Sequence, residues 1–371
     1  MALKRVNEKV NTMDSEGQPR SVLITGPGGI IGCHVAQLYA GTAGVSVVGV
    51  SRNTPENLAL DKCQHIRADL LDAVATREAL SGKAASITHV VFGAYLEGDS
   101  LSEQVRLNVD LLRNTLDALN ADHAALKHVT LFQGSKAYGN HLGPIKTPTK
   151  ESDPRLLGPH FYYAQEDHLR EMAEERGFRF TILRPDLIVG YSYGTPMNML
   201  MTIAVYASIC KELELPLRFP GTRAAYHALI HCTDAELLAR ATRWAGTSKE
   251  AENQIFNVTN GDQFRFEQVW SRVANYFQLD TAPPVPMSLA AHMADKAPVW
   301  DRLTKRHGLH PADWRKLVNW SFLDGFTLNE NQTDVFGSTI KIRQAGFGDC
   351  YDTEDRFVFW FDRLRSMRII P

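Results

Sequence analysis

Cysteine is scarce in this chain and never paired in a motif. No C-x-x-C occurs, and no cysteine stands near histidine at the spacing of a zinc site. An odd number of scattered thiols fits a reducing compartment better than a disulfide framework. The sequence therefore predicts neither a metal site nor a structural disulfide. The five cysteines are Cys33, Cys63, Cys210, Cys232 and Cys350.

The chain also lacks an excess of charge of either sign. Forty basic residues stand against 42 acidic ones, which gives a formal charge of −2 and a pI near 6.7. A nucleic-acid-binding or membrane-surface protein normally carries a basic patch that raises both values. This balance favours a small molecule as the partner.

Long apolar runs are absent as well. The first twenty residues are polar and resemble no signal peptide, so they are expected to form a mobile tail. The longest apolar stretch, residues 197–210, is shorter than the ~18 uncharged residues that a membrane span needs. These absences predict a soluble, cytoplasmic protein.

What the sequence does contain is a regular alternation of short β-branched runs with longer helical ones. Short apolar runs bounded by turn residues are typical of buried parallel strands, and helical spacers between them predict a doubly wound α/β sheet. The expected strands are 21–25, 45–50, 65–68, 87–92, 128–132 and 180–185.

This alternation of strands and helices ends near Gly190, which divides the chain into two predicted domains. Residues 21–190 are expected to form a dinucleotide-binding Rossmann domain, with returns to the sheet near 226–260. The rest, residues 191–225 and 262–371, is expected to form a smaller substrate-binding domain.

A glycine-rich turn, "TGPGGIIG", follows the first strand directly and opens a helical run. Glycines spaced in this way allow a tight turn and a close approach of pyrophosphate to backbone N–H groups at a helix N-terminus. At the first strand–helix junction the motif predicts a nicotinamide cofactor. The expected contacts here are Gly26, Gly28, Gly29, Ile30, Ile31 and Gly32.

The end of the second strand indicates which cofactor is used. An NAD enzyme usually has Asp or Glu there, but this chain has Ser51 and Arg52, a hydroxyl and a guanidinium that suit a 2′-phosphate. NADP(H) is therefore predicted, although Arg52 could also be an ordinary surface arginine. Asp69 stands where such folds meet the adenine, or could cap the next helix. Leu70, Pro185 and Ile188 complete the expected cofactor-binding residues.

The stretch "HFYYAQEDHLR" (160–170) raises the question of catalysis. Reduction of a carbonyl or an enone places negative charge on oxygen, and a tyrosine beside a cation can stabilise that charge. Tyr163 is expected to be this tyrosine, with Asp167 in the position where short-chain dehydrogenases carry lysine. The fifth expected strand ends in "LFQGSK", so Lys136 can supply the missing cation at the same end of the sheet, where Gly134 replaces the usual hydroxyl residue.

Several motifs together resemble one known family. "GxxGIIG", "FYYxxED", the displaced lysine, "LRFPG", "FNVTNGD" and the closing "DRLRSMRIIP" are similar to the plant progesterone 5β-reductase and iridoid synthase family of atypical extended short-chain reductases. The resemblance covers residues 20–371. It implies NADPH-dependent reduction of the C=C bond of 1,4-enones, with Tyr163 and Lys136 as the catalytic pair, and a homodimer through the helical runs 101–122 and 157–176.

The chain also departs from the family pattern. Ser51-Arg52 replaces an Arg-Arg pair, Tyr95 replaces a pocket tryptophan, and His160 replaces the Asn of "NFYY". The resemblance therefore leaves the substrate open within small apolar enones and enals. The residues expected to contact it are Tyr95, Tyr162, Met197, Asn198 and Met201.

Two alternatives remain open at this stage. The same tyrosine and lysine would serve a carbonyl reductase or alcohol dehydrogenase, in which the tyrosine protonates an alkoxide. A non-catalytic NADP-binding sensor would keep the glycine turn and show no turnover. Sugar-nucleotide epimerases share the architecture but normally need the serine and the Tyr-x-x-x-Lys motif that this chain lacks.

Overall fold

A computed structural model describes residues 20–371, apart from 57–61, 121–125, 196 and 311–312. The tail expected over residues 1–20 lies outside the described residues, except for Arg20. Seven strands form one sheet in the order β10-β6-β5-β4-β1-β2-β3, and every neighbouring pair is parallel. The predicted doubly wound sheet is confirmed. Its strands are β1 (Arg20–Thr25), β2 (Val45–Ser51), β3 (Gln64–Arg67), β4 (His89–Phe92), β5 (His128–Phe132), β6 (Arg179–Pro185) and β10 (Gln254–Val258).

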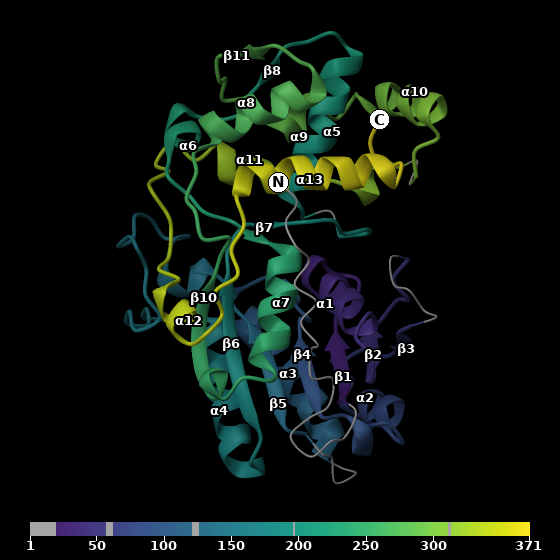
Figure 1. Cartoon of the computed structure of the whole chain (residues 1–371), viewed down its shortest axis with the longest axis vertical. Helices are drawn as coiled ribbons and strands as arrows, with labels where there is room; N and C mark the ends of the chain where they lie inside the picture. The colour runs from purple at the N-terminus through teal and green to yellow at the C-terminus, as the bar shows by residue number, and fades with distance from the viewer. Residues whose placement is uncertain (1–19, 57–61, 121–125, 196, 311–312) are drawn as a thin grey trace, which may run out of the picture.

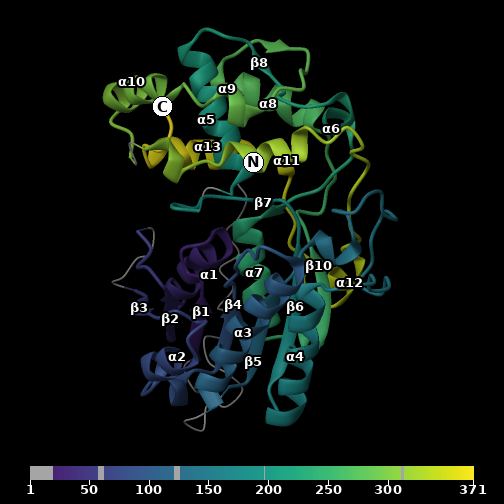
Figure 2. The same ribbon diagram turned by 180° about the vertical axis from the view of Figure 1, so that it is seen from behind.

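Helices cover both faces of this sheet, which explains why its strands are apolar on both sides. On the face shown in Figure 1, α1 (Ile30–Ala40) packs against α7 (Ala235–Ala245). Figure 2 shows the other face, where α2 (Ala73–Leu80), α3 (Leu101–Asn120) and α4 (Phe161–Arg176) lie side by side. Each face has its own buried apolar cluster.

A second, mainly helical lobe lies over the carboxyl ends of the strands (Figure 1). Its core includes Trp270, Trp300 and Trp360, none of them more than 1% exposed. Its helices are α5 (Met199–Glu212), α6 (Arg223–His227), α8 (Phe266–Phe277), α9 (Leu289–His292), α10 (Ala297–His307), α11 (Trp320–Thr327) and α13 (Thr353–Ser366), and β8 (Leu217–Arg218) pairs with β11 (Thr281–Ala282).

The two lobes are joined by a short parallel pair, β7 (Ile188–Val189) with β9 (Thr233–Asp234). Asp234 caps the N-terminus of α7 and also accepts hydrogen bonds from Arg356 and Trp360 of α13. This buried carboxylate therefore ties the C-terminal helix of the upper lobe to the sheet. The sheet-like stretch expected at 228–234 is reduced to β9 and isolated bridges at Ile230.

One segment lies apart from the lobe in which the sequence placed it. Helix α12 (Ile340–Gln344) packs against β10 at the edge of the sheet, and Ile342 belongs to the buried cluster of that face. Short 3-10 turns complete the chain: η1 (Ala84–Ser86), η2 (Ser135–Tyr138), η3 (Lys249–Ala251) and η4 (Trp314–Lys316).

All five cysteines are free thiols, and four of them are buried. Within the described residues, no helix has both the length and the apolar character needed to cross a bilayer. Nor do three His, Cys, Asp or Glu side chains of that part of the chain gather as a metal site would require.

Candidate active site

The glycine turn between β1 and α1 has a geometry that only glycine allows. Gly26 has φ of +67°, and a Cβ on Gly32 would lie 2.2 Å from the carbonyl oxygen of Gly26. Gly29 is the N-cap of α1 and provides no side-chain cap, so the helix N-terminus is left for an anion. Residues 26–32 therefore form a cradle that fits the pyrophosphate of a dinucleotide. Within it Gly28 accepts a hydrogen bond from Thr195, Ile30 begins α1, and Ile31 faces the large cleft described below.

Two arginines meet at the carboxyl ends of β2 and β3. Arg67 Nε donates to the carbonyl oxygen of Arg52 over 2.9 Å, and both side chains are exposed. Ser51 Oγ lies 2.9 Å from His65 Nε2, which fixes the hydroxyl at the base of this corner. The corner thus holds the serine and arginine predicted from the sequence together with Arg67, which sequence reasoning did not select. Its signal was the position of Arg67 at the end of the strand that neighbours β2.

Asp69 and Leu70 follow β3 directly. Asp69 is exposed and its carboxylate accepts the N–H of Leu71 over 3.1 Å, whereas Leu70 is buried. The helix-capping role considered for Asp69 belongs to Asp72, which accepts hydrogen bonds from Val74 and Ala75 at the start of α2. The carboxylate of Asp69 therefore does not cap α2.

A cleft of about 930 Å³ opens between the carboxyl ends of β4, β5 and β6 and the upper lobe. Its upper wall is formed by α11 and the segment that follows it. Because a doubly wound sheet binds ligands outside the carboxyl ends of its strands, this cleft is the expected place for chemistry. The residues predicted from the sequence that line it are Ile31, Tyr95, Lys136, Tyr162, Pro185, Ile188 and Met197.

Two residues predicted to contact substrate lie elsewhere. Asn198 is 1% exposed, caps α5 by accepting the N–H of Met201, and donates to the carbonyl oxygen of Gly190 over 2.9 Å. Met201 is fully buried in the upper lobe. Neither lines the cleft, because each side chain is already used to build the helix that follows the sixth sheet strand.

The two adjacent tyrosines of α4 point in different directions. Tyr163, the one selected from the sequence, donates its hydroxyl to the carbonyl oxygen of Ala137 over 2.7 Å and accepts the N–H of Leu156 over 3.1 Å. It is 7% exposed and does not line the cleft. Tyr162 does line it, since successive helix positions differ by about 100°. Of the two hydroxyl-bearing side chains, Tyr162 and not Tyr163 therefore lines the cleft.

The absence of a side chain at Gly134 makes room for that hydroxyl. A Cβ on Gly134 would lie 3.2 Å from Tyr162 Oη. Burial raises the pKa of Tyr162, and the nearby Asp186 raises it further, while Arg184 acts in the opposite direction. Tyr162 is therefore held as a neutral phenol, which can donate a hydrogen bond.

Lys136 reaches the same cleft from the turn η2 that follows β5. His160 connects this turn to the tyrosine helix: its Nε2 lies 3.1 Å from the carbonyl oxygen of Lys136, and its Nδ1 accepts the N–H of Tyr162 over 3.2 Å. Since Nδ1 accepts a backbone N–H, the proton of the imidazole is on Nε2. Burial lowers the pKa of His160, which favours this neutral form. The lysine and the tyrosine that line the cleft are thus positioned by one shared side chain.

A buried ionic network lies one helical turn below Tyr162. Glu166, four residues after Tyr162 and 4% exposed, lies 3.0 Å from Arg155, 3.0 Å from Arg170 and 3.6 Å from Arg184. Burial alone would raise the pKa of Glu166, but its bonds to Arg170 and Arg155 outweigh burial and lower it. In the Tyr-x-x-x-Lys motif the lysine stands four residues after the tyrosine. Counted from Tyr162, this position is Glu166, whose carboxylate stays charged and points inward.

Gln133 joins this network to the site. Its amide nitrogen donates to the carbonyl oxygen of Tyr162 over 3.0 Å, and its oxygen accepts from Arg184 Nε over 2.7 Å. Gln133 directly follows β5, Arg184 lies on β6, and Tyr162 is on α4, so one amide side chain holds three elements together at the floor of the cleft. Sequence reasoning did not select it, since a buried glutamine has no motif of its own.

Asp186 is a further charged group of the cleft that the sequence did not indicate. It follows β6 directly, lines the cleft, and its carboxylate accepts from Ser135 Oγ over 2.8 Å. Its other oxygen lies 3.1 Å from His231 Nε2, a residue 45 positions later in the chain. The cleft therefore contains one fixed carboxylate on the side of β6 as well as Lys136 on the side of β5.

The mouth of the cleft carries Tyr95 and Met197, which are 39% and 48% exposed. The hydroxyl of Tyr95 donates to Glu97 and accepts from Gln104 over 2.8 Å, and its ring packs 5.4 Å from that of Phe161. Burial raises the pKa of Tyr95, and Glu97 raises it further. Tyr95 is therefore a fixed wall of the cleft rather than an acid in it.

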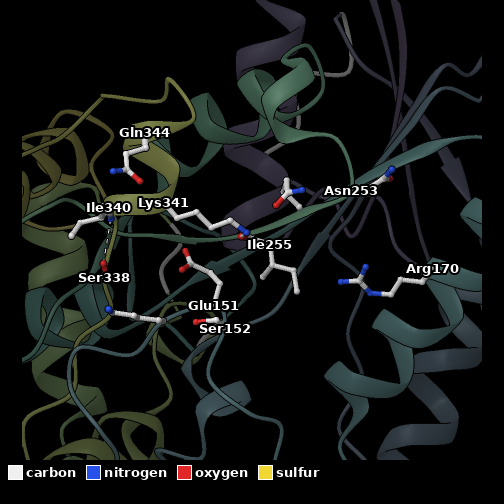
Figure 3. A pocket seen from close by; sticks show the side chains of 11 residues that line it. Glu151, Ser152, Arg170, Asn253, Ile255, Ser338, Ile340, Lys341 and Gln344 are labelled. Atoms are coloured by element: carbon white, nitrogen blue, oxygen red, sulfur yellow. Dashed lines mark hydrogen bonds between the residues drawn. The ribbon is translucent and has the colours of Figure 1, made fainter.

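A second cavity, of about 420 Å³, lies at the outer edge of β10 (Figure 3). Its charged side chains already serve the backbone of this edge strand: Lys341 Nζ donates to the carbonyl oxygen of Ile255 over 2.9 Å, and Glu151 accepts the N–H of Asn257 over 2.8 Å. Arg170, also part of its lining, is bonded to Glu166. Because side chains that occupy an edge prevent pairing with another chain, we assign this cavity a structural role.

Comparisons with known proteins agree with this geometry. The family model described as PRISE-like Rossmann-fold domain matches residues 64–371. An (S)-8-oxocitronellyl enol synthase from Camptotheca acuminata is 33% identical over 100% of this chain and 98% of its own length. Enzymes of the same name from Nepeta cataria and Catharanthus roseus are each 31% identical, over 97% and 94% of this chain and 96% and 92% of their own.

Solved structures support the fold. The chain is similar to a putative epimerase from Burkholderia cenocepacia, with a TM-score of 0.67, 18% identity and coverage of 94% of this chain and 99% of the other. It is also similar to a UDP-glucose 4-epimerase from Thermotoga maritima, with a TM-score of 0.68, 15% identity and coverage of 93% and 99%. At these identities the likeness concerns the architecture alone.

Proposed function

The chain belongs to the PRISE-like Rossmann-fold family, and from this premise we propose that it is an NADPH-dependent reductase of activated alkenes. The observation that carries the proposal is the convergence of Tyr162 and Lys136 on one cleft beside the glycine turn. The names of the relatives add support, because an 8-oxocitronellyl enol is formed by reducing a conjugated aldehyde. The substrate class is thus an enal or an enone.

NADP(H) is the proposed cofactor rather than NAD(H). The cradle of residues 26–32 suits the pyrophosphate, and the exposed guanidinium groups of Arg52 and Arg67 suit a 2′-phosphate. Neither β2 nor β3 ends in the carboxylate that usually binds an unmodified ribose. Asp69, Leu70, Pro185 and Ile188 complete the proposed binding surface.

When bound, NADPH supplies the hydride. Tyr162 donates a hydrogen bond to the carbonyl oxygen of the substrate, in the role that the sequence analysis gave to Tyr163. On hydride addition at the β-carbon, the π pair of the C=C bond would shift to the bond between the α-carbon and the carbonyl carbon, and the carbonyl π pair would move to oxygen. The Tyr162 hydroxyl and the ammonium of Lys136 would stabilise the resulting enolate charge. The α-carbon then takes its proton from water. Tyr95 and Met197 form the outer wall that contacts the apolar part of the substrate.

Exchange of each tyrosine for phenylalanine tests this assignment. Tyr162→Phe removes the donor to the developing enolate, so kcat with a linear enal should fall by about ten- to a hundred-fold, as expected for a hydrogen bond to a charged group. Tyr163→Phe removes a buried bond to Ala137 and should lower the melting temperature while keeping most of the activity. The measurement is NADPH consumption together with identification of the product.

The product also separates the alternatives. A saturated carbonyl compound supports the proposed reaction, whereas an allylic alcohol would indicate a carbonyl reductase. Binding of NADPH without turnover of any enal, enone or ketone would indicate a sensor. If Tyr163→Phe alone abolished turnover, the assignment of Tyr162 would be overturned.

We also propose that the protein is a cytosolic homodimer that pairs through the outer faces of α3 and α4. The two helices pack against each other on the face of the sheet that Figure 2 shows. Light scattering of the purified protein measures the assembly directly, and a monomeric mass would contradict the proposal.

A further inference from the structure

Asp186 is held in the cleft by three donors. Ser135 Oγ donates over 2.8 Å and the N–H of Leu187 over 3.1 Å to one carboxylate oxygen, and His231 Nε2 lies 3.1 Å from the other. The side chain of Asp186 is only 16% exposed. Three donated hydrogen bonds fix the orientation of the carboxylate.

The state of His231 decides whether this charge is cancelled. The N–H of Gly337 donates to His231 Nδ1 over 3.2 Å, so this nitrogen carries a lone pair and no proton. The imidazole proton is therefore on Nε2, where it is donated to Asp186, and the ring is neutral. In the described part of the chain, His231 is the one basic side chain within 4.0 Å of Asp186. The carboxylate thus keeps its negative charge.

The position of the Asp186 carboxylate in the cleft brings its charge near the hydride donor of the proposed reaction. Asp186 and Tyr162 line the same cleft, and Pro185 and Ile188 on either side of Asp186 line it too. In the proposed reaction the substrate oxygen is on Tyr162, so the ring that gives the hydride must lie within about 3.5 Å of the neighbouring carbon chain. As hydride leaves, that ring becomes positively charged. A fixed anion in the same cleft attracts this charge and does not need to reorganise.

We propose that Asp186 is the counter-charge of the oxidised nicotinamide ring, which stabilises the positive charge that develops on the ring during hydride transfer. The proposal rests on the proposed function, since it assumes that a nicotinamide cofactor occupies this cleft. Asp186 would therefore strengthen the binding of NADP⁺ relative to NADPH. Ser135 and His231 act through Asp186 and are positioning residues.

The ratio of two dissociation constants tests the proposal without any measurement of turnover. Asp186→Asn keeps the shape and the hydrogen bond from Ser135 but removes the charge. The dissociation constants of NADPH and NADP⁺, measured by calorimetry, should change so that Kd(NADP⁺)/Kd(NADPH) rises about ten-fold, the size expected for one charge at several ångströms in a partly solvated site. A merely structural role would shift both constants together and leave the ratio unchanged.

Asp324→Asn is the matched control. Asp324 also accepts three hydrogen bonds, from Ser288 Oγ, the N–H of Leu289 and the N–H of Ala290, but it does not line the cleft. This variant should keep the ratio of the wild type. Asp186→Glu, which retains the charge, should also keep it, and Asp186→Ser provides a second neutral variant should the asparagine variant not fold.

An unchanged ratio in a neutral variant that still binds both nucleotides overturns the proposal. Failure of the wild-type protein to bind either nucleotide would instead overturn the proposed function, so the two failures are distinguishable. A ratio that rises equally in Asp324→Asn would also count against Asp186, because the effect would then not be specific to the cleft.

Discussion

At the scale of a single residue, Gly134 leaves the space beside the Tyr162 hydroxyl. Its φ of −157° is extended backbone that any residue adopts, so an added side chain would act only through its contacts. A Cβ there would lie 3.2 Å from Tyr162 Oη, which is closer than ordinary contact, and the phenol would have to move by a few tenths of an ångström. Glycine at this position, in place of the usual hydroxyl residue, therefore leaves the space that the Tyr162 hydroxyl occupies.

Gly134→Ala should therefore reduce kcat by about ten-fold while the fold is kept, because small misplacements of a catalytic group are costly. Gly348→Ala is the control, since a Cβ there meets nothing within 4 Å. Steady-state kinetics of both variants, with circular dichroism to check folding, would measure the effect. Wild-type kcat in Gly134→Ala would show that the Tyr162 hydroxyl is not the group that needs this space.

Which of the two adjacent tyrosines of α4 faces the cleft could not be predicted from the sequence. The sequence predicted Tyr163 and Lys136 as a pair at one end of the sheet, whereas the tyrosine that lines the cleft with Lys136 is Tyr162. It could not decide between Tyr162 and Tyr163, because the rotation of α4 is set by contacts that lie far apart in the chain. Gln133 holds the carbonyl of Tyr162, and Ala137 and Leu156 hold the hydroxyl of Tyr163.

Helix α4 explains, at the scale of an element, why the ordinary motif lysine is absent. Counted from Tyr162, the lysine position is Glu166, whose side chain is 5% exposed among three arginines. Asp167 is 54% exposed and pairs with Arg155 at the surface. The inward position therefore requires a negative charge, and the cation of the site has to come from another element.

Two lysine substitutions one residue apart test this reading of α4. Glu166→Lys would bury a fourth cation among the arginines and should lower the free energy of unfolding by about 3–5 kcal/mol, as for a buried ion pair that loses one partner. Asp167→Lys loses only a surface pair and should cost about 1 kcal/mol or less. Urea unfolding measures both, and equal stabilities would contradict the network described for Glu166.

The inner strands were predictable because they are short apolar runs, as in Val22, Leu23 and Ile24 of β1, which are fully buried. The contacts between residues of different elements could not be predicted in this way. Arg67 reaches Arg52 only because β3 lies beside β2, and His231 reaches Asp186 only because β9 pairs with β7. Such contacts depend on topology, which a single sequence indicates only in outline.

The whole molecule consists of a sheet that supplies the polar groups and an upper lobe that closes over them (Figure 1). Lys136 and Asp186 follow the carboxyl ends of β5 and β6, and Tyr162 lies in the first turn of α4, whereas the wall opposite them comes from α11 and the segment after it. The glycine turn was predictable from residues close together in the chain. The upper wall was not, because its residues lie more than 130 positions after Asp186.

Stability of the whole molecule should depend on pH through His128, which lies in β5 in the interior of the sheet. Burial, with a smaller contribution from the neighbouring His89, lowers the pKa of His128 from 6.5 to about 3. Since the folded pKa is depressed, the unfolded chain binds the proton more readily. The contribution is therefore fully present above about pH 6.5 and is lost as the pH falls towards 3.

His128→Asn removes this titration and keeps a polar group for Thr181, whose hydroxyl lies 2.9 Å from His128 Nε2. Between pH 6 and pH 4 the free energy of unfolding of the wild type should fall more steeply than that of the variant, by about 1.4 kcal/mol per pH unit, which is the effect of one proton. His227→Asn, which removes an exposed imidazole, is the control. Urea unfolding at a series of pH values gives the slopes, and parallel slopes for wild type and His128→Asn would show that the buried imidazole is not what makes the sheet sensitive to acid.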